Sequence, residues 1–443
     1  MKFIETLKNV WKIEELRNRI ILTLGLLLVY RFGAQVVLPG IDAQQLEGLQ
    51  GNTEDGLLGL LNAFTGGAFA NASVFALGIM PYISASIVVQ LMGIAIPYLQ
   101  KLQKEGASGQ KKITQITRWL TIAICLVQAP GYLASLPALG IPQSAFLLGQ
   151  GGLFYFSSVI ILVTGCIFAM WLGEKITDKG IGNGISLLIM VGIIATLPKN
   201  FLLNASTRLE TNSVMLILFE IVIWLAIILA SVMLVMAVRK IAVQYARRTA
   251  SGGYEKNVFG SRQYIPLKLN ASGVMPIIFA QAIMTVSIMI FTGGGESGFM
   301  SRVFGDIYGF GYNMALAILI IIFTYFYTAI MINPRKIADE LKRSGGFIPG
   351  IRPGEETADY IDSLVSRITL PGSVFLAFIA IIPAIAKMAG VNDAFAMFFG
   401  GTSLLIMVGV ILDTLQQIES HLLMRHYDGL MKSGRIKGGR SVI

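Results

Sequence analysis

Ten apolar stretches limit what this chain can fold into more than any other feature of its sequence. A helix needs about 20 mostly apolar residues to cross the hydrocarbon core of a bilayer, and the fifth and ninth stretches are the shortest of the ten. No strand-like alternation of apolar and polar residues is present, so we expect helical spans, which satisfy their backbone hydrogen bonds internally. The predicted spans are Ile20–Val37, Ala72–Pro97, Trp119–Leu136, Leu153–Leu172, Asn183–Leu197, Val214–Val238, Ala271–Phe291, Tyr312–Ile332, Pro371–Ala386 and Ala394–Leu412.

Composition agrees with a polytopic membrane protein. Apolar residues make up 54% of the 443-residue chain and charged residues 14%, against about 25% charged residues in soluble domains. That balance excludes an ordinary soluble protein and a disordered one. With two cysteines and two histidines in the whole chain, a disulfide scaffold is excluded and no Cys/His metal site is expected.

The distribution of lysine and arginine predicts the orientation. Assigning alternate connections to opposite sides places 30 of these residues on one side and 5 on the other, and the richer side is cytoplasmic by the positive-inside rule. Both termini are therefore predicted to be cytoplasmic. The basic side comprises the N-terminus, the connections 98–118, 173–182, 239–270 and 333–370, and the tail 414–443.

The first 19 residues are predicted to form a cytoplasmic amphipathic helix at the membrane interface rather than a signal peptide. They include three glutamates, and no small-residue cleavage pattern follows the first apolar run. A solvated arm is the alternative. The apolar residues that share one helical face are Phe3, Leu7, Val10 and Trp11.

The sequence contains an internal repeat. Gly184–Ile194 and Gly401–Ile411 are identical at nine of eleven positions, and Gly78–Val88 and Gly273–Ile283 at five of eleven, including a Met-Pro pair. Both pairs are separated by five predicted spans, an odd number, so the repeated helices cross the membrane in opposite directions. We therefore predict an all-α protein of two inverted five-helix halves, 20–212 and 213–413.

The predicted spans hold few groups that could carry chemistry. Glu220 is expected to reach the interface at the non-cytoplasmic end of span six. The sequence has no zinc-protease, serine-hydrolase or P-loop motif. The chain is therefore not expected to be an enzyme or to hold a cofactor, and it cannot drive transport by itself.

Isoleucines occupy equivalent places in the repeats. Each of four lies five residues after its repeated glycine, and an inverted two-fold axis would bring such residues around one point in mid-membrane. They could form a constriction that excludes water and ions by dewetting, or they could simply pack between helices. The four are Ile83, Ile189, Ile278 and Ile406.

The segment 57–70 is apolar but too short to span a bilayer. It precedes span two on the non-cytoplasmic side, and the Thr65-Gly66-Gly67 sequence would let it fold back. Two readings remain open, a re-entrant cap over a central path and a helix lying on the surface.

Two basic connections, 239–270 and 333–370, exceed the usual loop length. The second carries paired prolines and glycines at Pro349–Gly354, which predict a turn that presents Arg352. Both connections could dock a large partner, including RNA phosphates. The positive-inside rule alone would explain their charge but not their length.

In its repeats, its short apolar segment and its basic connections, the sequence closely resembles the bacterial SecY family (SecY/Sec61-alpha). Members of this family are central subunits of the Sec protein translocase. The resemblance covers nearly the whole chain. It rests on the motifs Ala76–Ser86, Trp171–Glu174, Lys179–Ser186, Asn333–Asp339, Gly350–Gly354 and Phe399–Ile406.

The resemblance implies a ten-helix clamshell around a pore, with site residues of four kinds. The pore-ring positions are Ile79, Ile83, Ile185, Ile189, Ile278 and Ile406. The plug, which seals the resting channel, is 57–70, with Leu57, Leu58, Leu60, Leu61, Phe64, Gly66 and Gly67. The lateral gate, open to lipid, includes Ser84, Gln90, Gln128 and Asn270. The partner-docking residues are Arg247, Arg248, Lys256, Lys342, Arg343 and Arg352.

The resemblance further implies a passive protein-conducting channel in the bacterial cytoplasmic membrane, which translocates unfolded preproteins and inserts membrane proteins. The implied partners are SecE-like and SecG-like small membrane subunits, the SecA ATPase, the ribosome with its rRNA and proteins, preprotein signal sequences, a YidC-like insertase, accessory Sec proteins and the lipid bilayer.

One departure concerns the tip of 239–270, which reads Ser251–Lys256 where the family often carries paired arginines.

Two other functions fit the sequence less well. An inverted-repeat secondary transporter would need polar or charged coupling residues near Ile83 and Ile189, and few are present. An intramembrane enzyme would need convergent pairs of His, Asp or Ser residues, and the sequence offers no such pair.

Overall fold

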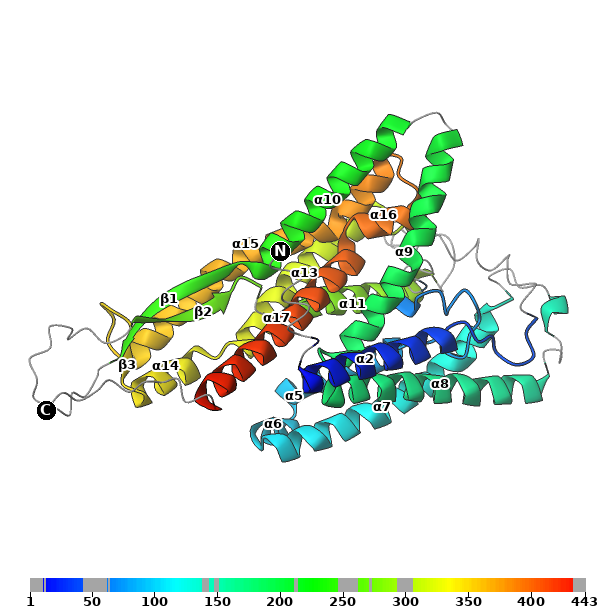
Figure 1. Cartoon of the computed structure of the whole chain (residues 1–443). Coiled ribbons are helices and arrows are strands. Elements are labelled where there is room, and N and C mark those ends of the chain that lie inside the picture. Colours follow the sequence, from blue (N-terminus) through cyan, green and yellow to red (C-terminus); the bar gives the residue numbers. More distant parts are fainter. Residues whose placement is uncertain are drawn as a thin grey trace, which may run out of the picture. The chain divides into compact units, whose positions relative to one another are not determined.

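The structure is a computed structural model that describes residues 11, 13–42, 62, 64–137, 143–146, 151–210, 214–245, 262–270, 273–292 and 306–432. The chain divides into two compact units. Unit 1 comprises Met1–Thr207, Asp393–Phe395 and Val410–Ile443, and unit 2 comprises Arg208–Asn392 and Ala396–Gly409. Helices dominate both (Figure 1).

The helices of unit 1 are joined by short connections and one buried irregular segment. They are α2 (Glu14–Gly33), α5 (Met80–Ala95), α6 (Pro97–Lys104), α7 (Ala107–Ser135), α8 (Gly152–Lys179), α9 (Gly184–Glu210, whose last three residues belong to unit 2) and the later part of α17 (Gly401–Lys432). A short 3-10 helix, η2, covers Gln143–Ala145.

Unit 2 combines helices with a small sheet. The helices are α10 (Val214–Met236), α11 (Met275–Thr292), α13 (Phe310–Met331), α14 (Pro334–Arg343), α15 (Glu355–Met388), most of α16 (Asp393–Phe399) and the first part of α17. The strands are β1 (Val238–Tyr245), β2 (Arg262–Lys268) and β3 (Gly346–Phe347).

Each of the ten predicted spans contains helix, although the second begins with irregular backbone before Met80 and the tenth is divided between α16 and α17. Within the described ranges, seven helices are long and apolar enough to cross a membrane, and an eighth span results if α5 and α6, bent by 102°, count as one. Several helices extend beyond their apolar stretch. α15 begins at Glu355, well before the predicted apolar stretch that starts at Pro371. The acidic side chains of Glu355 and Glu356 favour a helix N-terminus, but they carry no apolar signal.

The internal repeat is visible in where the helices begin. α9 starts at Gly184 and α17 at Gly401, the first residues of the first repeated pair. α5 starts at Met80 and α11 at Met275, the same position of the second pair. Gly78 and Gly273 both have positive φ values, 54° and 64°, which favour glycine. The repeat thus fixes the same turn and the same helix start twice.

The two long basic connections form one small folded region. β1 pairs with β2 in antiparallel register, from Val238 opposite Lys268 to Gln244 opposite Arg262, and with β3 at Gln244 opposite Phe347. We call the three strands, α14 and the start of α15 the sheet platform. Its core is made of Ile241, Val243, Leu267, Leu341, Ile348 and Ile361. Treating 239–270 and 333–370 as separate loops missed this region, because strand pairing between distant segments leaves no local signal.

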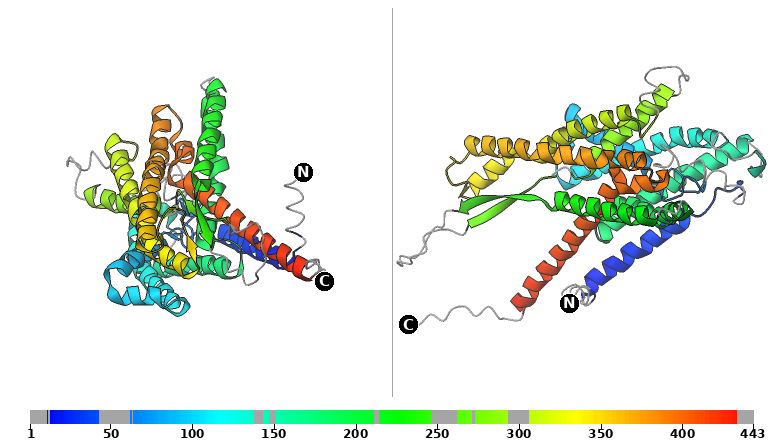
Figure 2. Two further views of the ribbon diagram at one scale, coloured as in Figure 1. Left: turned by 90° about the vertical axis from the view of Figure 1, so that its left-hand side faces the viewer. Right: turned by 90° about the horizontal axis from the view of Figure 1, so that it is seen from above.

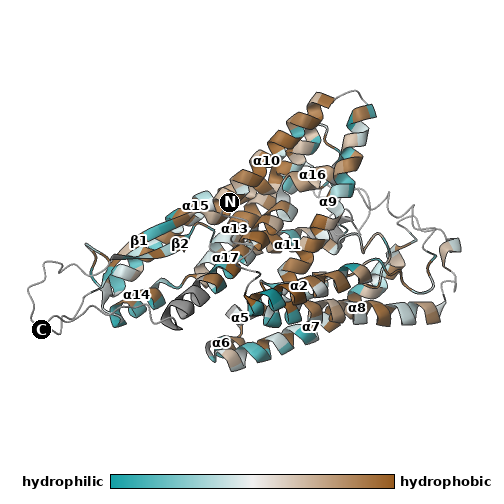
Figure 3. Ribbon diagram, viewed as in Figure 1, coloured by the Kyte–Doolittle hydropathy of each residue, from teal (hydrophilic) through white to brown (hydrophobic). Residues whose placement is uncertain are grey.

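Polarity changes sharply along unit 2. Figure 2 shows β1 and β2 continuing from the end of α10, and Figure 3 shows α10 apolar along its length while β1 and α14 are largely polar. Only 11% of the most apolar window of α10 is buried within the chain. Such a helix, apolar all round and exposed, belongs in lipid or against another membrane helix.

Candidate functional site

The described end of the predicted plug, Phe64–Ala70, is followed by irregular backbone that runs to Ile79. Thr65, Ala68, Ala72 and Ser73 are buried, although only Asn62, Phe64 and Thr65 are helical in the part of 62–79 that is described. Irregular backbone is tolerated at membrane depth only where protein covers it. This burial fits a re-entrant segment and not a helix lying on the surface. Leu57, Leu58, Leu60 and Leu61 lie outside the described residues.

Hydrogen bonds from several elements hold this segment. The Nη1 atom of Arg31 on α2 donates to the carbonyl oxygen of Gly66 at 2.7 Å. The hydroxyl of Tyr132 on α7 donates to the carbonyl oxygen of Phe69 at 2.9 Å. Asn62 Oδ1 accepts from the backbone nitrogen of Ala70 at 3.0 Å. Backbone groups without helical partners are thus satisfied by side chains.

The chain turns where the sequence predicted a break. Gly66 and Gly67 have φ values of 65° and 89°, a backbone conformation that side chains other than glycine rarely adopt. A methyl group at Gly66 would lie 2.6 Å from the Cα of Gly192 on α9, and one at Gly78 would lie 2.9 Å from Thr65 Cγ2. The segment therefore sits closely against α9 and against the residue that precedes Ile79.

Those two contacts place the plug end beside ring positions in unit 1. Gly192 lies about one helical turn beyond Ile189, and Ile79 is the residue that caps α5. Ile79 and Ile189 are buried, while Ile83 and Ile185 are half-buried. A methyl group at Gly173 on α8 would lie 2.9 Å from the Cγ1 atom of Ile185. The remaining two positions belong to unit 2, with Ile278 half-buried on α11 and Ile406 buried on α17.

The start of α9 is fixed by contacts that sequence reasoning missed. Thr23 Oγ1 on α2 accepts from the backbone nitrogen of Ile181 at 3.1 Å. Gln417 Oε1 on α17 accepts from Gly182 at 2.9 Å, and Thr177 Oγ1 on α8 accepts from Gly184 at 2.9 Å. The repeated glycines of 180–184 were the only local signal that backbone groups here need outside partners.

The predicted lateral-gate residues lie on different elements. Ser84 and Gln90 are half-buried on α5, and Gln90 Nε2 donates to Ser86 Oγ at 3.1 Å. Gln128 is exposed on α7, which packs against α5 in unit 1. Asn270 is buried in unit 2, between β2 and α11. The structure thus brings three of the four onto neighbouring helices.

Part of the predicted docking set lies on the sheet platform. The Arg352 side chain is 87% exposed, with a long contact of 3.8 Å to Glu356. Gly350 and Gly354 flank it with φ values of 85° and 117°, so the predicted turn that presents Arg352 is confirmed. Lys342 and Arg343 are exposed in the last turn of α14. The other three predicted docking residues, Arg247, Arg248 and Lys256, lie outside the described residues.

Two ion pairs join helices. Arg118 on α7 makes a two-pronged pair with Glu174 on α8, at 3.0 and 2.6 Å. Arg208 at the end of α9 pairs with Glu220 on α10 at 2.7 Å, and its guanidinium also donates to the carbonyl of Gly390. The expectation that Glu220 simply reaches the interface is wrong, because Glu220 is buried against Arg208.

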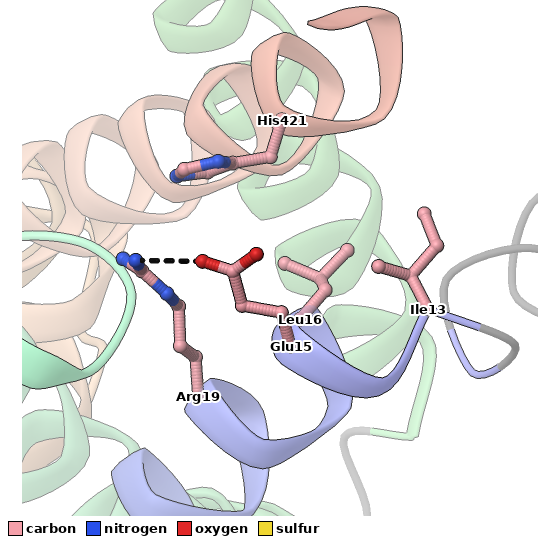
Figure 4. Close-up of a pocket in the computed structure, with 5 residues that line it drawn as sticks. All are labelled: Ile13, Glu15, Leu16, Arg19 and His421. Atoms are coloured by element: carbon pink, nitrogen blue, oxygen red, sulfur yellow. Dashed lines mark hydrogen bonds and ion pairs between the residues drawn. The ribbon is translucent and has the colours of Figure 1, made fainter. Parts of the chain in front are cut away.

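One small open cleft lies outside this arrangement. Ile13, Glu15, Leu16 and Arg19 of the α2 region line it with His421 of α17. Arg19 points toward Glu15, with which it pairs at 3.1 Å (Figure 4). None of the predicted site residues lines it. In the described parts of the chain, no three His, Cys, Asp or Glu side chains gather as metal ligands.

The fold has clear counterparts among solved structures. A structure described as a protein-conducting channel matches 95% of this chain and 94% of its own, with a TM-score of 0.60 at 18% identity. Sec61 in the canine ribosome–channel complex from the endoplasmic reticulum matches with a TM-score of 0.55 at 18% identity, over the same shares of the two chains. The chain is therefore a polytopic helical membrane protein with the fold of protein-conducting channels.

Sequence similarity narrows this class to one family. The family model described as SecY matches residues 73–415. The protein translocase subunits SecY of Haemophilus influenzae and Vibrio cholerae are 40% and 41% identical over 431 and 438 residues, and each comparison covers 96% of both chains. The chain belongs to the SecY family. The predicted fold class, family and channel-subunit function are confirmed.

Proposed function

We propose that this chain forms the pore through which unfolded polypeptides cross the membrane, and that the plug end and the isoleucine positions make its resting seal. The observation that carries this proposal is the seat of Gly66 on Gly192, about one turn from Ile189. This contact supports a seal because it brings the segment predicted to be the plug close to residues predicted to form the narrowest part of the path.

The chemistry of the ring suits a channel for proteins. Isoleucine side chains offer no hydrogen bonds, so they exclude water and ions by dewetting without binding one passing sequence over another. The ring widens by small helix shifts. The six ring residues are Ile79, Ile83, Ile185, Ile189, Ile278 and Ile406.

Sideways exit into lipid is proposed at the lateral gate. Ser84, Gln90 and Gln128 are supported as gate residues by their placement on α5 and α7. Polar side chains on apolar helices can form hydrogen bonds between the gate helices, and these bonds are weak enough for the helices to separate. Signal sequences and membrane segments of preproteins would pass here.

Partners are proposed to bind the sheet platform. Arg352, Lys342 and Arg343 form an exposed basic set there, which suits rRNA phosphates or an acidic protein surface. One solved structure with this fold is Sec61 in a ribosome–channel complex, and another is the yeast Ssh1 complex bound to the 80S ribosome. The ribosome and the SecA ATPase would supply the free energy, with SecE-like and SecG-like subunits completing the channel. A YidC-like insertase and accessory Sec proteins would receive membrane segments.

The proposed location is the bacterial cytoplasmic membrane, with both termini and the sheet platform in the cytoplasm. The asymmetry of 30 against 5 basic residues supports this orientation.

The proposal is tested by reconstitution. The purified complex is placed in liposomes with SecA, ATP and a preprotein, and the fraction of preprotein protected from added protease is measured. ATP-dependent protection, and copurification of small single-span subunits, are expected. Saturable, ion-coupled uptake of a small solute without protein import would instead favour a secondary transporter.

A further inference from the structure

Arg31 is an arginine in an unusual place. It lies in the last turn of α2, within the first predicted span, and its side chain is half-buried. Arginine within a membrane span is costly, so it marks a functional site by default and has an identifiable partner. In the sequence it counts only as one of five basic residues on the side poor in positive charge.

The partner of Arg31 is the plug backbone. Its Nη1 atom donates to the Gly66 carbonyl oxygen at 2.7 Å, across 35 residues of sequence. That carbonyl follows the helical residues Phe64 and Thr65, at the point where the backbone leaves helical geometry. A hydrogen bond from a charged donor is about twice as strong as one between neutral groups.

The guanidinium and the backbone of α9 both crowd the position that a side chain at Gly66 would occupy. A methyl group at Gly66 would lie 2.6 Å from Arg31 Nη1 and 2.6 Å from Gly192 Cα. Gly66 is therefore packed closely against both a side chain of α2 and the backbone of α9. Neither neighbour leaves room for a larger residue.

A second bond acts on the same segment from another helix. The Tyr132 hydroxyl donates to the Phe69 carbonyl at 2.9 Å, and its ring packs edge-on against Phe69 with centroids 4.9 Å apart. Tyr30, the neighbour of Arg31, stacks on Phe75 at 5.6 Å. The end of α2 is thereby fixed to the backbone that follows the plug, so Arg31 has a rigid base from which to reach Gly66.

We propose that Arg31 is a latch, a positioning residue that holds the plug end in its seat against α9 in the resting channel. This inference rests on the proposed function, because it assigns a residue to the seal of that same channel. Loss of the guanidinium should raise the population with the plug displaced by on the order of tenfold, as expected for one charge-assisted hydrogen bond.

The test uses the full chain in its complex with two readouts. One is resting ion conductance in a planar bilayer. The other is the labelling rate of a cysteine introduced by Phe64→Cys with a membrane-impermeant thiol reagent. The two native cysteines, Cys125 and Cys166, are buried and give little background.

Arg31→Met should raise both readouts about tenfold, and Arg31→Lys, which keeps a charged donor, should restore much of the difference. Arg17→Met on the same helix is the matched control and should change neither. Gly66→Ala adds a methyl group where Gly66 packs against α9 and should also raise the labelling rate. This second variant keeps the proposal testable if Arg31→Met does not fold.

Wild-type labelling in Arg31→Met, or in Gly66→Ala where Arg31→Met does not fold, would overturn the latch. Ile189→Gly separates this failure from failure of the proposed function. Conductance raised by Ile189→Gly with unchanged labelling in Arg31→Met would overturn the latch and leave the channel proposal standing. Raised labelling in Arg31→Met without any rise in conductance would support the latch and count against the seal.

Discussion

The Oε1 atom of Gln417 accepts a hydrogen bond from the backbone nitrogen of Gly182 at 2.9 Å, across 235 residues of sequence. The contact joins α17 to the connection that sets the first residue of α9. Thr23 and Thr177 capture neighbouring backbone groups of the same connection. Three helices thus define where α9 begins, and with it the places of Ile185 and Ile189.

Gln417→Leu should lower the free energy of unfolding by about 1 kcal/mol, because the Gly182 N–H loses its acceptor. The measurement is thermal unfolding of the purified complex in mild detergent. Gln417→Glu keeps an oxygen in place and should stay close to wild type. An equal loss of stability in both variants would show that the hydrogen bond to the side-chain oxygen does not stabilise the protein.

Glu220→Ala should lower the free energy of unfolding by more than Gln417→Leu does. It removes a buried carboxylate that pairs with the half-buried guanidinium of Arg208 at 2.7 Å. Breaking a buried pair on one side costs about 3–5 kcal/mol, which is an upper bound here because Arg208 is only half-buried. Combining it with Arg208→Met should recover part of the loss, since no charge is then left uncompensated. Strict additivity of the two single effects in unfolding measurements would contradict the coupling.

Glycine at Ile83, Ile189, Ile278 and Ile406 together should make the resting channel conduct ions, because the apolar constriction loses its side chains. Valine at the same four positions keeps β-branched apolar groups and should leak much less. Single-channel recordings in a planar bilayer decide the matter. Unchanged conductance in the glycine variant would remove these residues from the seal.

Arg352→Glu should block motor-dependent export and leave assembly intact. The side chain is 87% exposed and its contact with Glu356 is long, so its loss costs little stability. Arg367→Glu, at an exposed basic residue within α15, is the control. Normal preprotein import by the Arg352→Glu complex in membrane vesicles would exclude the docking role.

The sequence allowed the helices to be located but not their ends. Each apolar run contains helix, because lipid imposes one simple requirement on composition, and seven or eight of the helices in the described residues are long and apolar enough to span a membrane. The runs missed the polar extension of α15 to Glu355, which lies outside the apolar pattern. The repeated glycines marked the helix starts more closely than the apolar runs did. Gly78 and Gly273 adopt a positive φ just before α5 and α11 begin, and this conformation is a property of glycine rather than of polarity.

The site was harder to predict than the fold. Four of the six isoleucine positions followed from the repeat, Ile79 and Ile185 came only from the family resemblance, and the break at Gly66 followed from its glycines. The role of Arg31 did not, because its partner is a backbone carbonyl that carries no side-chain signature in the sequence. The same is true of Gln417 and Gly182.

The pairing of β1 with β3 has a consequence for how the molecule is made. Gln244 lies opposite Phe347, so the second strand leaves the ribosome about 100 residues after the first, a delay of roughly 5–20 s at ordinary synthesis rates. During that interval the hairpin has an uncovered edge. A newly made chain therefore cannot complete the sheet platform until β3 and the start of α15 have been synthesised.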